Sequence, residues 1–537
     1  MTSTFDPDAP FTPIADLVRV HAAARPHAPA LVQDDDVLDW AALDALMDRV
    51  AAALQRDGAR PGDALAICAA ASLRYAALFL GALRAGVVVA PLAPSVTPDQ
   101  FAAMVGDAQA RWLAVDATAR PLLEALDGHA PQRIALDGSA IDGALAFDAW
   151  LAPEGTQPAP VDVRPEWPFN IIYSSGTTGT PKGIVQPHAM RWAHVQRGAE
   201  YGYGPDGVTL LATPLYSNTT LVVFFPTVAA GGTTVLLAKF DAARYLALAE
   251  RRRATHTMLV PVQYQRLMAL PSFGEHDLSS FRVKFCTSAP FPAALKAEVL
   301  ARWPGGLVEF YGMTEGGGTC ILKAHERPDK LHTVGRPAPG SDIRLIDEAG
   351  RELPPGATGE VVGRSPGMMS GYHGRPEATR AAEWFDAAGQ RFIRTGDVGR
   401  FDDDGFLVLL DRRKDVVISG GFNVYPSDLE AVLRGHPAVA DAAVVGVPSA
   451  EWGETPVAFV VRATGHADAD AEALRAWANE RLGKTQRLAA LQWTDELPRS
   501  AIGKVLKREL RERWQEAVNE SNGAGAFTAS SASRSPG

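Results

Sequence analysis

The chain has 537 residues, with 52 basic and 62 acidic side chains and a formal net charge of -10. This length predicts two to four folding units, and contents of 47% hydrophobic and 21% charged residues exclude a fibrous or wholly disordered chain. The acidic balance argues against general attraction to nucleic acid or to anionic membranes.

Cysteine usage and the N-terminus indicate the cellular compartment. Cys68, Cys286 and Cys320 are far apart and show neither zinc-ligand nor disulfide-framework spacing. The first residues lack the basic start and apolar run of a signal peptide, and the most apolar stretch, 68–92, is interrupted by Arg74 and Arg84. We expect a cytoplasmic protein with no integral membrane segment.

The first two-thirds of the chain alternates helix-like and strand-like segments. Apolar residues at helical spacing predict a helix over 43–54, and the runs 64–68, 73–85 and 87–90 predict strand, helix and strand in a parallel unit. Further strand-like runs occupy 208–213, 232–237, 256–260 and 282–286. These patterns predict a large α/β body.

The pattern changes near residue 340. Short strand-like runs separated by Gly, Asp and Pro predict a β-rich subdomain over about 340–411, which closes an N-terminal domain of residues 1–411. A small mobile α+β domain over 412–520 follows, beginning with a helix for which Ser427 and Glu430 are expected to form a capping box. The Gly/Ser/Ala-rich tail, 521–537, is expected to be disordered.

The run YSSGTTGTPKG at 173–183 is the most informative motif. It follows an apolar segment, and its glycines let the backbone approach an anion while hydroxyls and Lys182 supply donors and positive charge. A Walker-type loop would end in Gly-Lys-Ser/Thr, whereas Pro181 precedes the lysine and Gly183 follows it. A kinase-type loop lacks its partner motifs, and a merely flexible loop is the remaining alternative. We expect a phosphate-binding loop.

Three further motifs follow in order: YGMTE at 311–315, RTGD at 394–397 with DRRKD at 411–415, and PRSAIGK at 498–504. Together the four resemble the motifs of the adenylate-forming superfamily of acyl-CoA synthetases, peptide-synthetase adenylation domains and luciferases, over about residues 11–514. The resemblance is strongest to acid-CoA ligases. It implies ATP-dependent conversion of a carboxylic acid to an acyl-adenylate, followed by transfer of the acyl group to coenzyme A.

The resemblance also implies roles for individual residues. Tyr311 would stack beside the adenine, Thr314 would contact the α-phosphate and Glu315 would hold Mg²⁺. Asp397 would bind the ribose hydroxyls, with Arg412 as a nearby cation. The implied catalytic residues are Lys504, Thr178 and Glu315, and the implied ATP-binding set is Ser174, Ser175, Gly176, Thr177, Thr178, Gly179, Lys182, Tyr311, Gly312, Thr314, Asp397 and Arg412.

Coenzyme A binding is expected to follow rotation of the small domain about a hinge at Lys414. The segment ISGGFN at 418–423 would then face the site, where Gly421 leaves room for the pantetheine arm. The residues implied are Gly420, Gly421, Phe422 and Trp452.

The expected acid pocket contains no charged side chain apart from Glu315, which is assigned to the metal. A second carboxylate or an ammonium group would need a charged partner, so a hydrophobic aryl, alicyclic or medium-chain fatty acid is favoured. Ser217 replaces a histidine common in acyl-CoA synthetases. The pocket residues implied are Tyr216, Ser217, Asn218, Val262, Ser288, Ala289, Gly312, Met313, Gly316 and Gly317, with Gly316, Gly317 and Gly318 expected to leave space.

Two other functions stay open at this point: a ligase that loads the acid onto a separate carrier protein, and a nucleotide-binding protein without turnover. The partners considered are a small carboxylic acid, a second copy of the chain in a homodimer, and a lysine acetyltransferase acting on Lys504. The sequence leaves the particular acid, the oligomeric state and the pathway undetermined.

Overall fold

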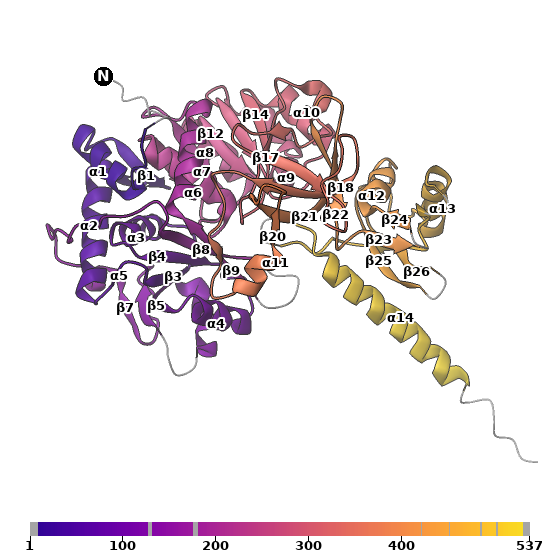
Figure 1. Cartoon of the computed structure of the whole chain (residues 1–537), viewed down its shortest axis with the longest axis horizontal. Coiled ribbons are helices and arrows are strands. Elements are labelled where there is room, and N and C mark those ends of the chain that lie inside the picture. The colour runs from indigo at the N-terminus through magenta and orange to yellow at the C-terminus, as the bar shows by residue number, and fades with distance from the viewer. Residues whose placement is uncertain are drawn as a thin grey trace, which may run out of the picture.

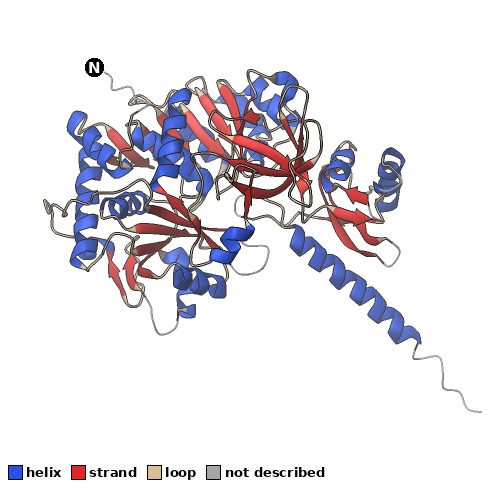
Figure 2. Cartoon of the chain, viewed as in Figure 1, coloured by secondary structure: helices blue, strands red, loops and turns tan. Residues whose placement is uncertain are grey.

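The computed structural model describes residues 9–126, 131–174, 181–419, 422–449, 452–483, 486–500 and 503–529. Two large sheets with their helices form the N-terminal body, a smaller β-rich subdomain lies beside them, and the C-terminal domain follows at one end (Figure 1). Figure 2 shows helices on the outside of both large sheets and also between them. None of the described helices combines the length and apolarity needed to cross a bilayer.

The first large sheet supports the predicted phosphate-binding loop. Its strands β3 and β4 pair in parallel, with helix α3 (Leu73–Arg84) between them in the chain, which confirms the predicted strand-helix-strand unit. Strand β8 delivers the loop and β9 leaves it, so the loop joins two antiparallel neighbours. In spatial order, the described strands are β19 (Gly371–Tyr372), β9 (Lys182–Pro187), β8 (Pro168–Ser174), β4 (Val88–Leu92), β3 (Ala64–Cys68), β5 (Ala110–Val115), β6 (Gln132–Ala135) and β7 (Ala144–Ala146).

The second large sheet has a parallel centre. The four strand-like runs predicted between residues 208 and 286 are its strands β10 to β13, and β14 continues the parallel pairing before ending at Tyr311. In order, the described strands are β16 (Arg336–Pro337), β15 (Cys320–Lys323), β14 (Gly306–Tyr311), β13 (Val283–Cys286), β12 (His256–Leu259), β10 (Val208–Leu211), β11 (Thr233–Leu236), β1 (Pro29–Gln33) and β2 (Asp36–Asp39).

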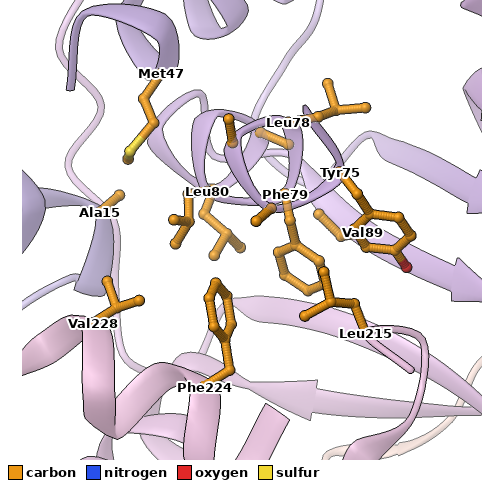
Figure 3. Packing of buried hydrophobic residues seen from close by; sticks show 14 of the residues in the cluster. Ala15, Met47, Tyr75, Leu78, Phe79, Leu80, Val89, Leu215, Phe224 and Val228 are labelled. Atoms are coloured by element: carbon orange, nitrogen blue, oxygen red, sulfur yellow. The ribbon is translucent and has the colours of Figure 1, made fainter. Parts of the chain in front are cut away.

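A single apolar core joins the two sheets through the helices between them, and Figure 3 shows part of this packing. Helix α2 (Trp40–Arg56) buries most of the predicted stripe, including Met47 and Val50, and leaves Leu46 partly buried. A Cβ on Gly81 of α3 would lie 2.6 Å from the Val50 Cβ, so a glycine is needed for this close approach. Also in this core are α1 (Ile14–Ala24), α6 (His188–Gly198) and α7 (Asn218–Ala229).

Shorter helices cover the outer faces of the sheets. They are α4 (Pro98–Asp107), α5 (Phe147–Trp150), α8 (Ala242–Arg251), α9 (Pro261–Met268), α10 (Ala293–Arg302) and the 3₁₀ segments η1 (Ala117–Ala125), η2 (Ala199–Tyr201), η3 (Pro271–Glu275) and η4 (Pro328–Lys330).

The β-rich subdomain occupies the predicted region. Its longest strand, β21, carries Asp397 and pairs with β22, which carries Arg412. The described strands are β17 (Asp342–Ile346), β18 (Gly359–Arg364), β20 (Glu383–Phe385), β21 (Arg391–Phe401) and β22 (Leu407–Arg412), and α11 (Pro376–Ala381) lies at its border with β19.

The C-terminal domain has its own apolar cores. Its described elements are β23 (Val417–Ser419), β24 (Phe422–Val424), α12 (Pro426–Arg434), β25 (Val439–Ser449), β26 (Gly453–Arg462), α13 (Ala471–Arg481), β27 (Ala490–Thr494) and α14 (Lys507–Ala529). Helix α14 extends away from the domain (Figure 1).

Two details of this domain differ from the sequence analysis. Ser427 forms no cap: α12 begins at Pro426, the Ser427 amide donates to Asp411 Oδ2 at 2.8 Å, and Glu430 Oε1 instead accepts from the Val444 amide at 2.9 Å. Ser427 and Glu430 therefore bond to residues outside α12 and not to each other, so the expected capping box does not form. In addition, helix α14 continues to Ala529, beyond residue 521 where a disordered tail was expected. A helix satisfies its own backbone, so it can continue where no core is available.

Candidate active site

A continuous cleft of about 1970 Å³ lies where the N-terminal body meets the C-terminal domain. The body contributes Thr314, Glu315 and Thr395, and the C-terminal part contributes Arg412, Lys414 and Lys504. Four motifs that are far apart in the sequence therefore contribute residues to one cavity.

Asp397 connects two of these motifs. The Tyr311 hydroxyl donates to Asp397 Oδ2 at 2.8 Å, and Arg412 Nε lies 3.0 Å from Asp397 Oδ1. Burial raises the pKa of Tyr311 well above its usual value, and the Asp397 charge adds to this effect, so the hydroxyl stays a donor at neutral pH. The carboxylate is thus fixed in place by a neutral donor and a cation.

Glu315 is bound by a tyrosine that lies beside Lys182. Its Oε1 accepts from the Tyr372 hydroxyl at 2.9 Å, and the Lys182 ammonium lies 5.2 Å from the centroid of the same tyrosine ring. No cluster of three or more metal ligands occurs among the described side chains. A single carboxylate fits Mg²⁺ bound mainly by water and nucleotide phosphates, because that ion commonly takes only one or two protein carboxylates.

A buried polar network binds the backbone carbonyl of Thr314. Gln186 Nε2 donates to the Thr314 carbonyl at 2.6 Å, and Arg191, which is fully buried, donates to Asn170 Oδ1 at 3.0 Å and to Gln186 Oε1. Gln186 lies on β9, directly after the phosphate-loop motif. The network therefore ties the YGMTE segment to the strand that leaves that loop.

Lys504 enters the cleft from the C-terminal domain. Its side chain remains accessible to water because it faces the cavity, yet the surrounding protein lowers its pKa to about 8. Arg412 lowers the pKa further and Asp397 opposes this effect. The ammonium group is therefore close to its protonation midpoint in mildly alkaline solution.

The lysine loop is docked against the body. Gly503 has φ +77°, and a Cβ there would lie 2.7 Å from Val262 Cγ1 on α9. Only glycine fits this combination of backbone conformation and close approach without strain. The position of Lys504 thus depends on contact between the two domains.

The linker between the domains is held by charges. Lys414 lines the cleft, and Asp415 Oδ1 accepts from Arg511 of α14 at 2.8 Å. Burial opposes ionisation of Asp415, but Arg511 and Lys414 outweigh it and lower the pKa of this carboxyl. The expected hinge therefore contacts the helix that follows the lysine motif.

Phe422 and Trp452, the described members of the expected coenzyme A set, lie away from the cleft in this conformation. Phe422 is 60% exposed and Trp452 is 51% exposed, and neither lines the cavity. Two sets of predicted site residues lie outside the described part of the chain: Ser175, Gly176, Thr177, Thr178 and Gly179 of the loop, with Gly420 and Gly421. For Ser174, the structure describes the backbone alone.

Part of the expected acid pocket lines the cleft. The residues found there are Tyr216, Ser217, Asn218, Ser288, Gly312 and Met313. Ser288 has φ +81°, a strained value for a non-glycine residue, and its hydroxyl lies 2.6 Å from the Thr219 hydroxyl. Strain held by the surrounding structure is common where a side chain must face a ligand.

The remaining expected pocket residues lie elsewhere. Val262 contacts Gly503, and Ala289 is absent from the cavity lining. The prediction that glycines 316–318 leave room for the acid is wrong, because each is packed against the β-rich subdomain. A Cβ on Gly316 would lie 2.0 Å from the Gly367 carbonyl oxygen, and one on Gly318 would lie 1.9 Å from Ile343 Cδ1.

Sequence reasoning missed the inner end of the cleft. Its residues come from α6 and the turn after it: His194, Arg197, Gly198, Tyr201 and Tyr203. The expectation of an uncharged pocket is therefore wrong, because Arg197 lines it. His194, Arg197 and Tyr201 follow one another at intervals of three and four residues, which is the spacing of one helical face. That periodicity was a signal available in the sequence.

Family models match most of the chain. The model described as AMP-binding enzyme matches residues 18–373, and the model described as AMP-binding enzyme C-terminal domain matches residues 428–504. This chain belongs to the AMP-binding enzyme family. Within this AMP-binding enzyme, the two matched parts are the two domains that meet at the cleft.

Similar proteins cover nearly the whole length of this AMP-binding enzyme. The chain is 34% identical to a feruloyl-CoA synthase of Amycolatopsis sp, over 92% of this chain and 97% of that protein. It is 33% identical to the fatty acid--[acyl-carrier-protein] ligase ScoC of Streptomyces coeruleorubidus, over 94% and 96%. The solved structure of the amide bond synthetase McbA from Marinactinospora thermotolerans has a TM-score of 0.82 and 33% identity, over 94% of this chain and 100% of McbA.

Proposed function

We propose that the chain is an ATP-dependent acid-CoA ligase that works through an acyl-adenylate. A carboxylate oxygen of the acid attacks the α-phosphorus of ATP, the bond to the β-phosphate breaks, and pyrophosphate leaves. The sulfur of coenzyme A then attacks the acyl carbon, the bond to AMP breaks, and the thiol proton passes to solvent. The observation that carries this proposal is the entry of Lys504 into the cavity lined by Glu315 and Arg412, where Arg412 pairs with Asp397.

The described residues suit the first step. Asp397, fixed by Tyr311 and Arg412, offers acceptor oxygens to a sugar diol. Lys182, Lys504 and Arg412 supply positive charge where a carboxylate meets a triphosphate, and charge stabilisation of this kind is often the largest catalytic effect. Mg²⁺ at Glu315, when bound, would neutralise further phosphate charge.

The second step requires a different arrangement. Lys504 lines the cleft in this conformation, while Phe422 and Trp452 face solvent. We propose rotation of the C-terminal domain about Lys414, which would exchange these two faces at the adenylate. Coenzyme A is the proposed acceptor. The acceptor varies among similar proteins. Their names include a CoA synthase, an acyl-carrier-protein ligase and an amide bond synthetase.

The acid itself is proposed to have a largely apolar body. Val222, Val223, Phe285 and Phe310 also line the cavity. Such walls favour aryl, alicyclic or medium-length alkyl groups.

Pyrophosphate release from ATP tests the proposal, with a panel of aromatic, alicyclic and fatty acids and with or without coenzyme A. An acyl-CoA product, identified by mass spectrometry, is the expected result. Adenylate formation with no thioester would favour loading of a separate carrier protein. Nucleotide binding with no pyrophosphate from any acid would favour the alternative without turnover.

A further inference from the structure

The inner end of the cleft, formed by α6 and the turn after it, is polar although apolar side chains line the same cleft. Helix α6 directs His194 and Arg197 to the cavity, and the turn after it adds Tyr201 and Tyr203. The rings of Tyr201 and Phe285 meet edge to face with their centroids 5.1 Å apart. Tyr203 stacks on His256 at 4.4 Å. Packing therefore fixes the aromatic rings.

These polar atoms lack partners within the described parts of the chain. The buried Nδ1 of His194 and the hydroxyls of Tyr201 and Tyr203 make no hydrogen bond. A polar group left unpaired away from water destabilises the protein. Three in one place indicate a site that a ligand completes, because buried polar groups in native proteins are nearly always satisfied.

Arg197 adds a positive charge without a paired carboxylate. Among the described side chains, no hydrogen bond or ion pair reaches its guanidinium, and Glu200, whose charge acts on it from nearby, is itself bound to Lys323. Burial lowers the pKa of Arg197, but a guanidinium stays protonated at neutral pH. The enclosed end of the pocket therefore carries one uncompensated cation.

The neighbouring groups are uncharged. Burial lowers the pKa of His194 well below its usual value, and the charges of Arg191 and Arg197 act in the same direction. Burial raises the pKa of Tyr201 and Tyr203 above the ordinary tyrosine value. At neutral pH the cluster thus presents one cation, two phenol donors and one neutral imidazole.

We propose that the acid substrate carries a second carboxylate at the end remote from the reacting carboxylate, and that this group binds Arg197, Tyr201 and Tyr203. The inference rests on the proposed adenylation of a carboxylic acid in this cleft. A guanidinium can hold a carboxylate through two parallel hydrogen bonds, and a phenol hydroxyl can donate to a remaining lone pair. The walls of Val222, Phe285 and Phe310 bind the apolar body between the two acid groups.

Acids that share a body and differ in the group at the distal end test this assignment. The measurement is kcat/KM for pyrophosphate release with cinnamate, 4-hydroxycinnamate and 4-carboxycinnamate, and with hexanoate and adipate. We expect the dicarboxylates to exceed their apolar counterparts by about 10- to 100-fold, the range that one charged hydrogen-bonding site supplies. A higher value for the apolar or the hydroxylated acids would overturn the proposal.

Substitution of Arg197 assigns the effect to this residue. In Arg197→Met, kcat/KM for the dicarboxylates should fall toward that for their apolar counterparts, so that the ratio between them approaches one. Arg282→Met is the matched control. Arg282 is exposed and does not line the cleft. It pairs with Asp206, which lies nine residues after Arg197 in the chain. The control variant should leave the ratio unchanged. An unchanged ratio in Arg197→Met would overturn the proposal even if pyrophosphate release continued.

Calorimetric titration separates this inference from the proposed function. Binding of 4-carboxycinnamate to the full chain with a non-hydrolysable ATP analogue requires no turnover. A loss of affinity of about tenfold or more in Arg197→Met supports the distal site, whatever the outcome of the activity assay. Equal affinity of the wild type and Arg197→Met would contradict it.

Discussion

Asp397 and Arg412 face each other across the ladder of β21 and β22, and Arg412 Nε lies 3.0 Å from Asp397 Oδ1. Arg412 is the last residue of β22, directly before the linker to the C-terminal domain. The ion pair therefore couples the proposed ribose-binding carboxylate to the start of the expected hinge. Because the Arg412 side chain is 38% exposed, water screens the pair and limits its contribution to stability, so we attribute its importance to positioning.

Replacing Asp397 with asparagine should weaken ATP binding. The substitution removes the charge that Arg412 and Tyr311 fix, and one acceptor oxygen becomes a donor amide. We expect KM for ATP to rise about 10- to 100-fold, the cost of a lost charged hydrogen bond, with a smaller change in KM for the acid. Steady-state pyrophosphate release measures both constants. Asp402→Asn removes the same charge from the same subdomain, outside the cleft, and should leave KM for ATP unchanged.

Adenylation should decline as pH rises through about 8. The ammonium of Lys504 is charged below that pKa and neutral above it, so positive charge in the cleft is lost on the alkaline side. A profile of kcat/KM for adenylation between pH 6.5 and 9.5 reports this group in the free enzyme. Lys504→Arg keeps its charge throughout and should remove the decline, whereas Lys504→Ala should abolish adenylation. A decline of equal midpoint in Lys504→Arg would assign the titration to another residue.

The sequence predicted the parts of this site that have fixed local patterns. The α/β body, its parallel strands and the positions of Asp397 and Lys504 followed from apolar periodicity and from four motifs in order. Arg197 was missed because it lies in the last turn of α6, in a segment without a motif, and helical periodicity alone does not show which face of α6 lines the cleft.

Packing partners explain the errors at Gly316 and Ser427. The motif predicts that Gly316 leaves space for the acid, but the backbone at Gly367 occupies that space. The capping box failed because the side chain of Asp411 and the backbone of Val444 offered stronger tertiary contacts to the same groups. Local sequence contains neither of these distant partners.

A methyl group on Gly503 should disturb the docking that places Lys504. At φ +77° a side chain is strained, and its Cβ would lie 2.7 Å from Val262 Cγ1. We expect Gly503→Ala to lower the adenylation rate by about tenfold or more, which corresponds to roughly 1.4 kcal/mol, the scale of a strained backbone residue. Thioester formation from supplied acyl-adenylate should change little, because that step is proposed to use the other face of the domain.

A second substitution distinguishes docking from general damage to the loop. Val262→Ala removes the methyl groups against which the new Cβ would collide, so the double variant Gly503→Ala with Val262→Ala should recover part of the adenylation rate. The coupling energy from the double-mutant cycle measures this contact. Recovery is expected to be partial, because the positive φ of residue 503 still disfavours alanine. Strictly additive losses in the two single variants would contradict a contact between the lysine loop and α9.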